Sequence, residues 1–169
     1  MDNLMIERAN KDDAASIIEY LNQVGGESDN LLFGKDEIQI TIEEEKGFIE
    51  RMNQSSNSIL LLGKVNGKIV SIGSLSGKGR KRIAHRGEVA LSVSKEYWGL
   101  GFGTKVLEEL IIYANHKEIN VIELTVKADN EAGIHLYEKL GFKKIGYYEK
   151  YFKIEDKYYD AYLMNLYLV

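Results

Sequence analysis

The chain has 169 residues, 44% of them hydrophobic and 28% charged, which is ordinary for a soluble globular protein and suits one domain, residues 1–169. It has no cysteine, no run near the roughly 20 apolar residues of a membrane span and no signal peptide, so we expect a cytoplasmic protein without disulfides or membrane binding. The net charge of −4 argues against nucleic-acid binding, which needs a large basic face.

Apolar spacing and turn signals predict strands and helices along the whole chain. In chain order we expect a strand at residues 4–8, helices at 14–24 and 41–52, and strands at 58–65, 68–76 and 83–93. These are followed by a helix at 103–116, a strand at 121–126, a helix at 130–140, and strands at 142–151 and 158–169. The strand at 83–93 is long enough to contain a bulge.

Short polar motifs mark the ends of several elements. Thr41 to Glu44 has the form of a capping box, and Asn66-Gly67 is a strong signal for a tight hairpin. Asp129 or Asn130 is expected to cap the helix that follows. Gly141 suits the left-handed residue that ends that helix.

The segment at residues 88–104 contains the clearest functional signal. An apolar strand ends in a polar turn, and Gly99, Gly101 and Gly103 then accompany the start of a helix. The first turn of a helix has backbone N–H groups without internal partners and carries about half a positive charge. Glycine lets an anion approach that backbone, so the junction suits a phosphate or pyrophosphate. The glycine spacing fits neither the P-loop nor the dinucleotide-binding fingerprint.

Two blocks of sequence resemble the GNAT N-acetyltransferase superfamily. Residues 98–103 are similar to its acetyl-coenzyme A motif, Gln/Arg-x-x-Gly-x-Gly/Ala, and residues 130–142 to its segment Asn-x-x-Ala-x-x-x-Tyr-x-x-x-Gly-Phe. The sequence departs from these motifs at two places. Trp98 stands where Gln or Arg is usual, and near the usual alanine site Ala132 is followed directly by Gly133. The resemblance implies the α+β GNAT fold, a mostly antiparallel sheet of six or seven strands flanked by about four helices, in the order β-α-α-β-β-β-α-β-α-β-β.

By this resemblance, the glycine turn and the strand before it would bind acetyl-coenzyme A or coenzyme A. The pyrophosphate would contact the turn backbone, and the pantetheine arm would pair with the strand where it separates from the strand at 121–126. The Val93 amide would polarise the thioester carbonyl. For Asn130, a helix cap and a cofactor contact are both open. The implied cofactor-binding residues are Leu91, Ser92, Val93, Trp98, Gly99, Leu100, Gly101, Phe102, Gly103, Thr104 and Asn130.

The resemblance also implies two catalytic residues, Tyr137 and Glu88. Tyr137 matches the family position at which a tyrosine donates a proton to the departing sulfur. Glu88 begins the strand before the carbonyl-binding segment, where family members often have a base. The alternative is that Glu88 is a surface residue in a salt bridge. His85 or a chain of water molecules are the competing bases. The histidines show no metal-ligand spacing, so no metal is expected.

We expect an enzyme that moves the acetyl group of acetyl-coenzyme A directly to a primary amine of a small molecule or of a peptide or protein N-terminus, as a monomer or homodimer. The alternatives are a non-catalytic coenzyme A-binding domain of the same fold and a nucleotide-binding module.

The family's acceptor pocket would involve residues 25–40 and 147–159, whose Asp, Glu and Tyr content favours a cationic amine. The basic run at 78–82 is interpreted as a solvated hairpin tip, with an acidic partner as the alternative.

Overall fold

The elements of the fold follow the predicted order. The computed structural model describes residues 3–169, so the first two residues of the predicted domain lie outside it. The strands are β1 Met5–Arg8, β2 Ile59–Val65, β3 Lys68–Gly77, β4 Arg86–Val93, β5 Val121–Lys127, β6 Lys143–Ile154 and β7 Lys157–Tyr167. The helices are α1 Ala14–Gly25, α2 Ile42–Gln54, α3 Phe102–His116 and α4 Glu131–Lys139. The predicted α+β class and order of elements are confirmed.

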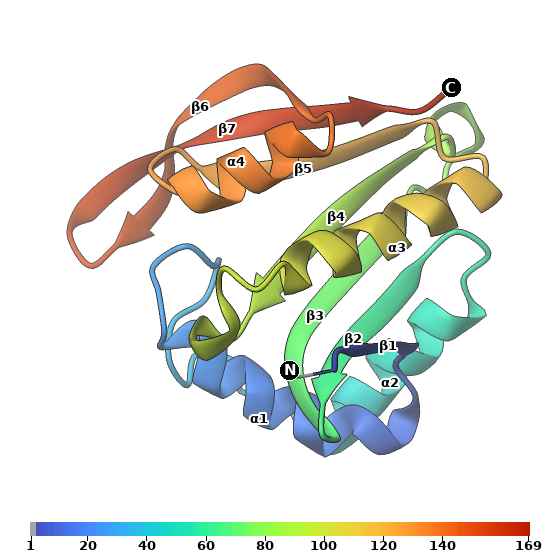
Figure 1. The fold of residues 1–169 in the computed structure, drawn as a ribbon, viewed down its shortest axis with the longest axis vertical. Coiled ribbons are helices and arrows are strands. Elements are labelled where there is room, and N and C mark those ends of the chain that lie inside the picture. Colours follow the sequence, from blue (N-terminus) through green and yellow to red (C-terminus); the bar gives the residue numbers. More distant parts are fainter. Residues whose placement is uncertain (1–2) are drawn as a thin grey trace.

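The strands within residues 3–169 form one seven-stranded sheet in the order β1-β2-β3-β4-β5-β7-β6 (Figure 1). Neighbouring strands are antiparallel except β4 and β5, which are parallel. This parallel pairing is short, because only Arg86 to Glu88 pair with Val121 to Glu123, although β4 continues to Val93. Beyond Glu88 the two strands diverge, as the resemblance implies. We call residues 86–88 the paired end of β4 and residues 91–93 its open end.

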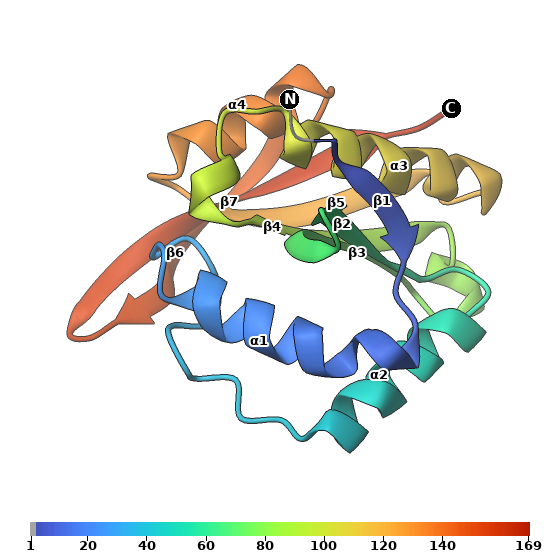
Figure 2. The ribbon, with the colours of Figure 1, turned by 60° about the horizontal axis from the view of Figure 1, so that its bottom comes forward.

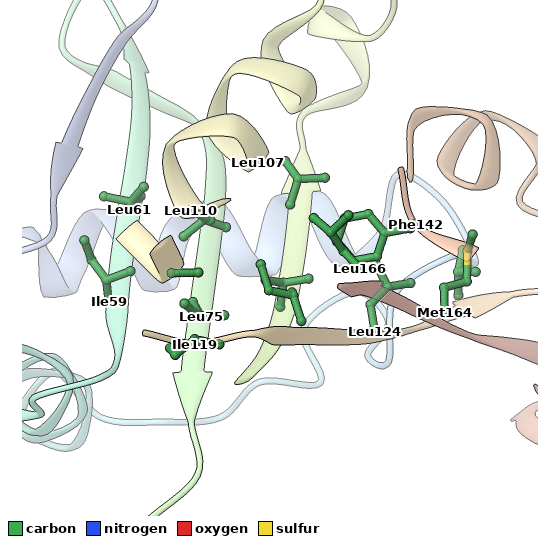
Figure 3. Packing of buried hydrophobic residues seen from close by; sticks show 14 of the residues in the cluster. Ile59, Leu61, Leu75, Leu107, Leu110, Ile119, Leu124, Phe142, Met164 and Leu166 are labelled. Carbon is green, nitrogen blue, oxygen red and sulfur yellow. The ribbon is translucent and has the colours of Figure 1, made fainter. Parts of the chain in front are cut away.

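Helices cover both faces of the sheet, with α3 and α4 on one face and α1 and α2 on the other (Figure 2). Leu107 and Leu110 of α3 are fully buried in one cluster with Leu75 of β3 (Figure 3). On the opposite face, Ile17 of α1 and Ile49 of α2 are buried in a second cluster. Burial of each such side chain is worth about 1.5–3 kcal/mol, so apolar stripes hold the helices to the sheet. Among residues 3–169, no helix is long and apolar enough to cross a membrane.

The predicted capping box, hairpin turn and helix-ending glycine are all present in the structure. Thr41 Oγ1 accepts a hydrogen bond from the Glu44 amide at 3.1 Å, and the Glu44 carboxylate accepts one from the Thr41 amide at 2.8 Å. Asn66 and Gly67 have φ angles of 50° and 79°, as the hairpin turn requires. Gly141 follows α4 with a φ of 97°.

Two predicted strand boundaries are wrong. Lys81–Ile83 form a 3-10 turn, and β4 begins at Arg86 because the Lys78 amide bonds to the Arg86 carbonyl at 3.1 Å and closes the hairpin there. The pairing of β3 with β4 has no register shift, so the bulge that a longer strand would have allowed is absent. β6 continues past its predicted end at residue 151 to Ile154, and β7 begins at Lys157 and ends at Tyr167, before its predicted end. β6 extends because Glu155 adopts a φ of 54° and allows a tight turn where a loop was expected.

Candidate functional site

A cavity of about 500 Å³ lies beside the open end of β4. On the α3 and α4 face it is lined by the glycine turn and by α4, and on the other face by the segment that follows α1. All of the predicted cofactor-binding residues line it except Leu100, which is exposed, and Tyr137 also lines it. The cavity therefore joins the two faces of the sheet where the parallel pairing has ended.

The glycine turn presents a helix N-terminus to this cavity. Gly99 and Gly101 have φ angles of 76° and 80°, and Gly101 is the N-cap of α3 without any side-chain cap. The first helical hydrogen bond joins the Lys105 amide to the Gly101 carbonyl at 3.1 Å, so the amides of residues 102–104 have no partner within the helix. A Cβ atom on Gly101 would meet nothing within 4 Å, so conformation rather than space requires glycine there. These amides and the helix dipole form a site suited to an anion.

The open end of β4 directs backbone groups into the gap left by β5. Hydrogen bonds between antiparallel strands alternate from residue to residue. Since the Ser94 amide bonds to the Val70 carbonyl at 2.8 Å, the backbone N–H and C=O of Val93 point away from β3. The Trp98 indole Nε1–H donates to the Val93 carbonyl at 2.8 Å, which leaves the Val93 N–H facing the gap. The sequence did not predict this role for Trp98, which was expected only to lack a phosphate contact.

Tyr137 lies in α4 beside the same gap. Its ring is partly buried and contacts Phe142 edge-on, with 5.7 Å between the ring centroids. Burial raises the pKa of the Tyr137 phenol to about 12. The hydroxyl is therefore neutral near pH 7 and can donate a proton.

Asn130 has the helix-cap role that its sequence position suggested. Its Oδ1 accepts a hydrogen bond from the Gly133 amide at 3.0 Å at the start of α4. A Cβ atom on Gly133 would lie 2.6 Å from the Asn130 side chain, which explains why glycine stands at that point. Asn130 also lines the cavity, so the cap leaves room for a ligand contact.

Glu88 and His85 are not among the residues that line the cavity. Glu88 is exposed at the paired end of β4, where Lys78 Nζ lies 3.6 Å from its carboxylate. His85 precedes β4, and its carbonyl accepts a hydrogen bond from the Asn120 amide at 2.8 Å. The structure thus brings Tyr137 to the open end of β4 but places both candidate bases at the opposite end of the strand.

Two residues of the α1 region contribute to the site without any sequence motif to mark them. Glu27 lines the cavity, and the buried Tyr20 contacts Ser92, which lines it. The Tyr20 hydroxyl is hydrogen-bonded to Ser92 Oγ at 3.0 Å, and burial raises its pKa. The Glu27 carboxylate accepts a hydrogen bond from the Lys95 amide at 2.7 Å. The resemblance assigned residues 25–40 to the acceptor pocket by their acidic content but singled out neither residue. The packing of α1 on the sheet, which brings Tyr20 to Ser92 and Glu27 to Lys95, has no local sequence signal.

Comparison with known proteins places the chain in a family. A family model described as "Acetyltransferase (GNAT) family" matches residues 30–142. The N-alpha-acetyltransferase RimI of Mycobacterium tuberculosis is 31% identical over 99 residues, which cover 59% of this chain and 60% of that protein. The L-amino acid N-acetyltransferase AaaT of Escherichia coli is 27% identical over 128 residues, covering 75% of this chain and 79% of that protein. The chain thus spans less than two thirds of the length of RimI.

Solved structures extend the similarity over the whole fold. The crystal structure of an acetyltransferase of the GNAT family from Streptococcus pneumoniae matches with a TM-score of 0.95 and 38% identity, covering 99% of this chain and 100% of that one. The structure of yncA from Salmonella typhimurium, solved with its cofactor acetyl-CoA, has the same fold, with a TM-score of 0.86 at 21% identity over 99% of this chain and 95% of that one. The family match covers more than half of the residues, and the chain belongs to the GNAT acetyltransferase family.

Proposed function

We propose that this protein is an acetyl-coenzyme A-dependent N-acetyltransferase that passes the acetyl group directly to a primary amine. The observation that carries the proposal is the cavity that joins the two faces of the sheet at the open end of β4. A cofactor on the α3 and α4 face and an amine on the α1 face can meet there without a covalent enzyme intermediate. The relatives named as N-acetyltransferases support the same reaction class.

The glycine turn would hold the pyrophosphate of the cofactor. The amides of residues 102–104 supply donors, and Lys139 of α4 adds a positive charge to the lining of the same cavity. The pantetheine arm would take the place of the missing neighbour of β4 and pair with backbone at Leu91 and Val93, as an added strand does. When bound, acetyl-coenzyme A supplies an activated thioester.

The chemistry needs one donor for the developing oxyanion and one proton for the sulfur. As the amine nitrogen attacks the thioester carbon, the Val93 N–H would donate to the carbonyl oxygen. The acceptor enters as an ammonium and would release one proton to water before its nitrogen attacks. When the carbon–sulfur bond breaks, Tyr137 would give its phenolic proton to the thiolate, and the second proton that the nitrogen loses as the amide forms would pass through water to restore the phenol. A free thiol has a pKa of about 8.5, but burial disfavours a thiolate as it disfavours the Tyr137 phenolate. Burial by itself makes Tyr137 a weaker acid. The proton transfer therefore relies on the same penalty acting on the thiolate and on the position of the phenol beside the sulfur.

A thermal-shift assay and a thiol-release assay together test this function. Coenzyme A should raise the melting temperature by mass action, and ATP should raise it much less. Acetyl-coenzyme A with a panel of primary amines should release free thiol. Stabilisation by coenzyme A without thiol release for any amine would favour the non-catalytic alternative. Stabilisation by ATP but not by coenzyme A would overturn the assignment of the cavity.

A further inference from the structure

Glu27 occupies a distinct place in the cavity. It follows α1 and, among the described residues that line the cavity, it is the one carboxylate. Its Oε2 accepts a hydrogen bond from the Lys95 amide at 2.7 Å, two residues beyond Val93, and its Oε1 accepts one from Gln23 Nε2 at 3.0 Å. These two bonds hold the carboxylate near the open end of β4, on the α1 face of the sheet. Each oxygen keeps lone pairs for a further donor.

The two sides of the cavity differ in charge. The α3 and α4 side combines a helix N-terminus with Lys139, which favours an anion. The α1 side has Glu27, with apolar Val24 and Leu31 beside it. A carboxylate in a partly enclosed site attracts an ammonium group and repels another carboxylate. The α3 and α4 side of the cavity therefore favours an anionic group of the cofactor, and the α1 side favours a cationic group of the acceptor.

We propose that Glu27 pairs with the ammonium group of the acceptor and selects amines whose neighbouring atoms carry no negative charge. A peptide N-terminus or an amino acid amide meets this condition, because its α-carbonyl is neutral. A free α-amino acid does not, because it would bring its own carboxylate toward Glu27. This inference rests on the proposed function, since it names the acceptor class of that same site.

The alternative role of Glu27 is purely structural, as an acceptor for the Lys95 amide. Glu27→Gln separates the two roles, because the glutamine oxygen still accepts from that amide while the charge is lost. Asp29→Asn provides a matched control. Asp29 lies in the same segment, is exposed, and lines a separate cavity of about 340 Å³ with Glu155 and Asp156. This control removes the same charge but leaves the lining of the larger cavity intact.

The test compares L-alaninamide with L-alanine, which have nearly the same size and differ in the carboxyl group. Binding of each to the protein–coenzyme A complex is measured by calorimetry, and kcat/KM for each by thiol release with acetyl-coenzyme A. We expect Glu27→Gln to reduce the ratio of kcat/KM for L-alaninamide to that for L-alanine by about fivefold to twentyfold. This range lies between the effects of losing an exposed and a desolvated ion pair. Asp29→Asn should leave the preference within about twofold, the range of screened surface charges.

The two readouts distinguish failure of the inference from failure of the proposed function. An equal response to the two amines in the parent protein, or the same preference in Glu27→Gln as in the parent, would overturn the acceptor assignment. Binding of L-alaninamide that depends on Glu27 but never leads to thiol release would support the acceptor assignment and contradict acetyl transfer. Affinity for coenzyme A should be unchanged in both variants, and a parallel loss of that affinity in Glu27→Gln would indicate the structural role.

Discussion

The two ends of β4 belong to one strand and differ in what surrounds them. At the paired end, the backbone of β4 is hydrogen-bonded to β5, and Lys78 contacts the carboxylates of both Glu88 and Glu123. At the open end, β5 has withdrawn, and the backbone faces a cavity lined by residues from both faces of the sheet. Sequence alone placed the cofactor at the open end but put the candidate bases, Glu88 and His85, at or beside the paired end. Geometry favours the open end, because a ligand needs backbone groups and space that the protein does not already use.

The largest expected effect comes from closing the anion site at the glycine turn. Gly101→Asp should weaken coenzyme A binding by about a hundredfold or more, because a carboxylate beside the α3 N-terminus repels the pyrophosphate. Gly67→Asp is a matched control, because Gly67 has a φ of 79° and equally open surroundings in the β2–β3 turn. Both variants bear the same left-handed strain, of about 1–2 kcal/mol. Calorimetry should show lost affinity in Gly101→Asp alone, and equal affinity in the two variants would refute the pyrophosphate site.

Removal of the proton donor at the open end is expected to come next. Tyr137→Phe keeps the ring beside Phe142 and should lower kcat by about tenfold to a thousandfold, with little change in cofactor affinity. Tyr113→Phe is the control, because the Tyr113 hydroxyl bonds to the Ser58 carbonyl at 2.9 Å, and Tyr113 does not line the cavity. It should lose stability and keep its turnover. If Tyr137→Phe turned over as fast as the parent, the thiolate would have to leave unaided or take its proton from water.

Trp98 tests how the open end is held in place. Trp98→Phe removes the hydrogen bond to the Val93 carbonyl but leaves an aromatic ring at the cavity wall. Loss of one such bond is worth about 0.5–1.5 kcal/mol, so kcat should fall by about twofold to tenfold as the Val93 amide loses its fixed direction. Steady-state kinetics at saturating acetyl-coenzyme A provides the measurement. A rise in KM for acetyl-coenzyme A at constant kcat would instead make Trp98 a binding contact.

Sequence alone predicts much of this architecture, and the failures have physical causes. The apolar spacing of α3, the Thr41 capping box and the Asn66-Gly67 turn are local signals, and each predicted its element. The glycine turn could be proposed as an anion site because the pattern that suggests it lies in consecutive residues. The contacts of Trp98 and Glu27 depend instead on how the chain after β4 and α1 folds back on that strand. The predicted strand start at residue 83 was wrong because turn residues at 83–85 were counted as strand.

The smallest effect on catalysis is expected at the paired end. Glu88→Gln removes one partner of an exposed ion pair with Lys78, which is worth about 0–1 kcal/mol of stability. Because Glu88 does not line the cavity, the pH profile of kcat/KM between about pH 6 and 9, where a general base would titrate, should match that of the parent. A selective loss of activity at the acid end of that profile would restore Glu88 as the base, acting through a water chain or a rearranged strand.

Residue-resolved amide hydrogen exchange tests the central claim most directly. It compares the amides of Val93 at the open end and Gly87 at the paired end, with and without coenzyme A. If pantetheine pairs with the open end, coenzyme A should slow exchange at Val93 and leave Gly87 unchanged, because Gly87 already lies within the β4–β5 pairing. Bound coenzyme A without slower exchange at Val93 would show that the cofactor lies elsewhere and would contradict the account.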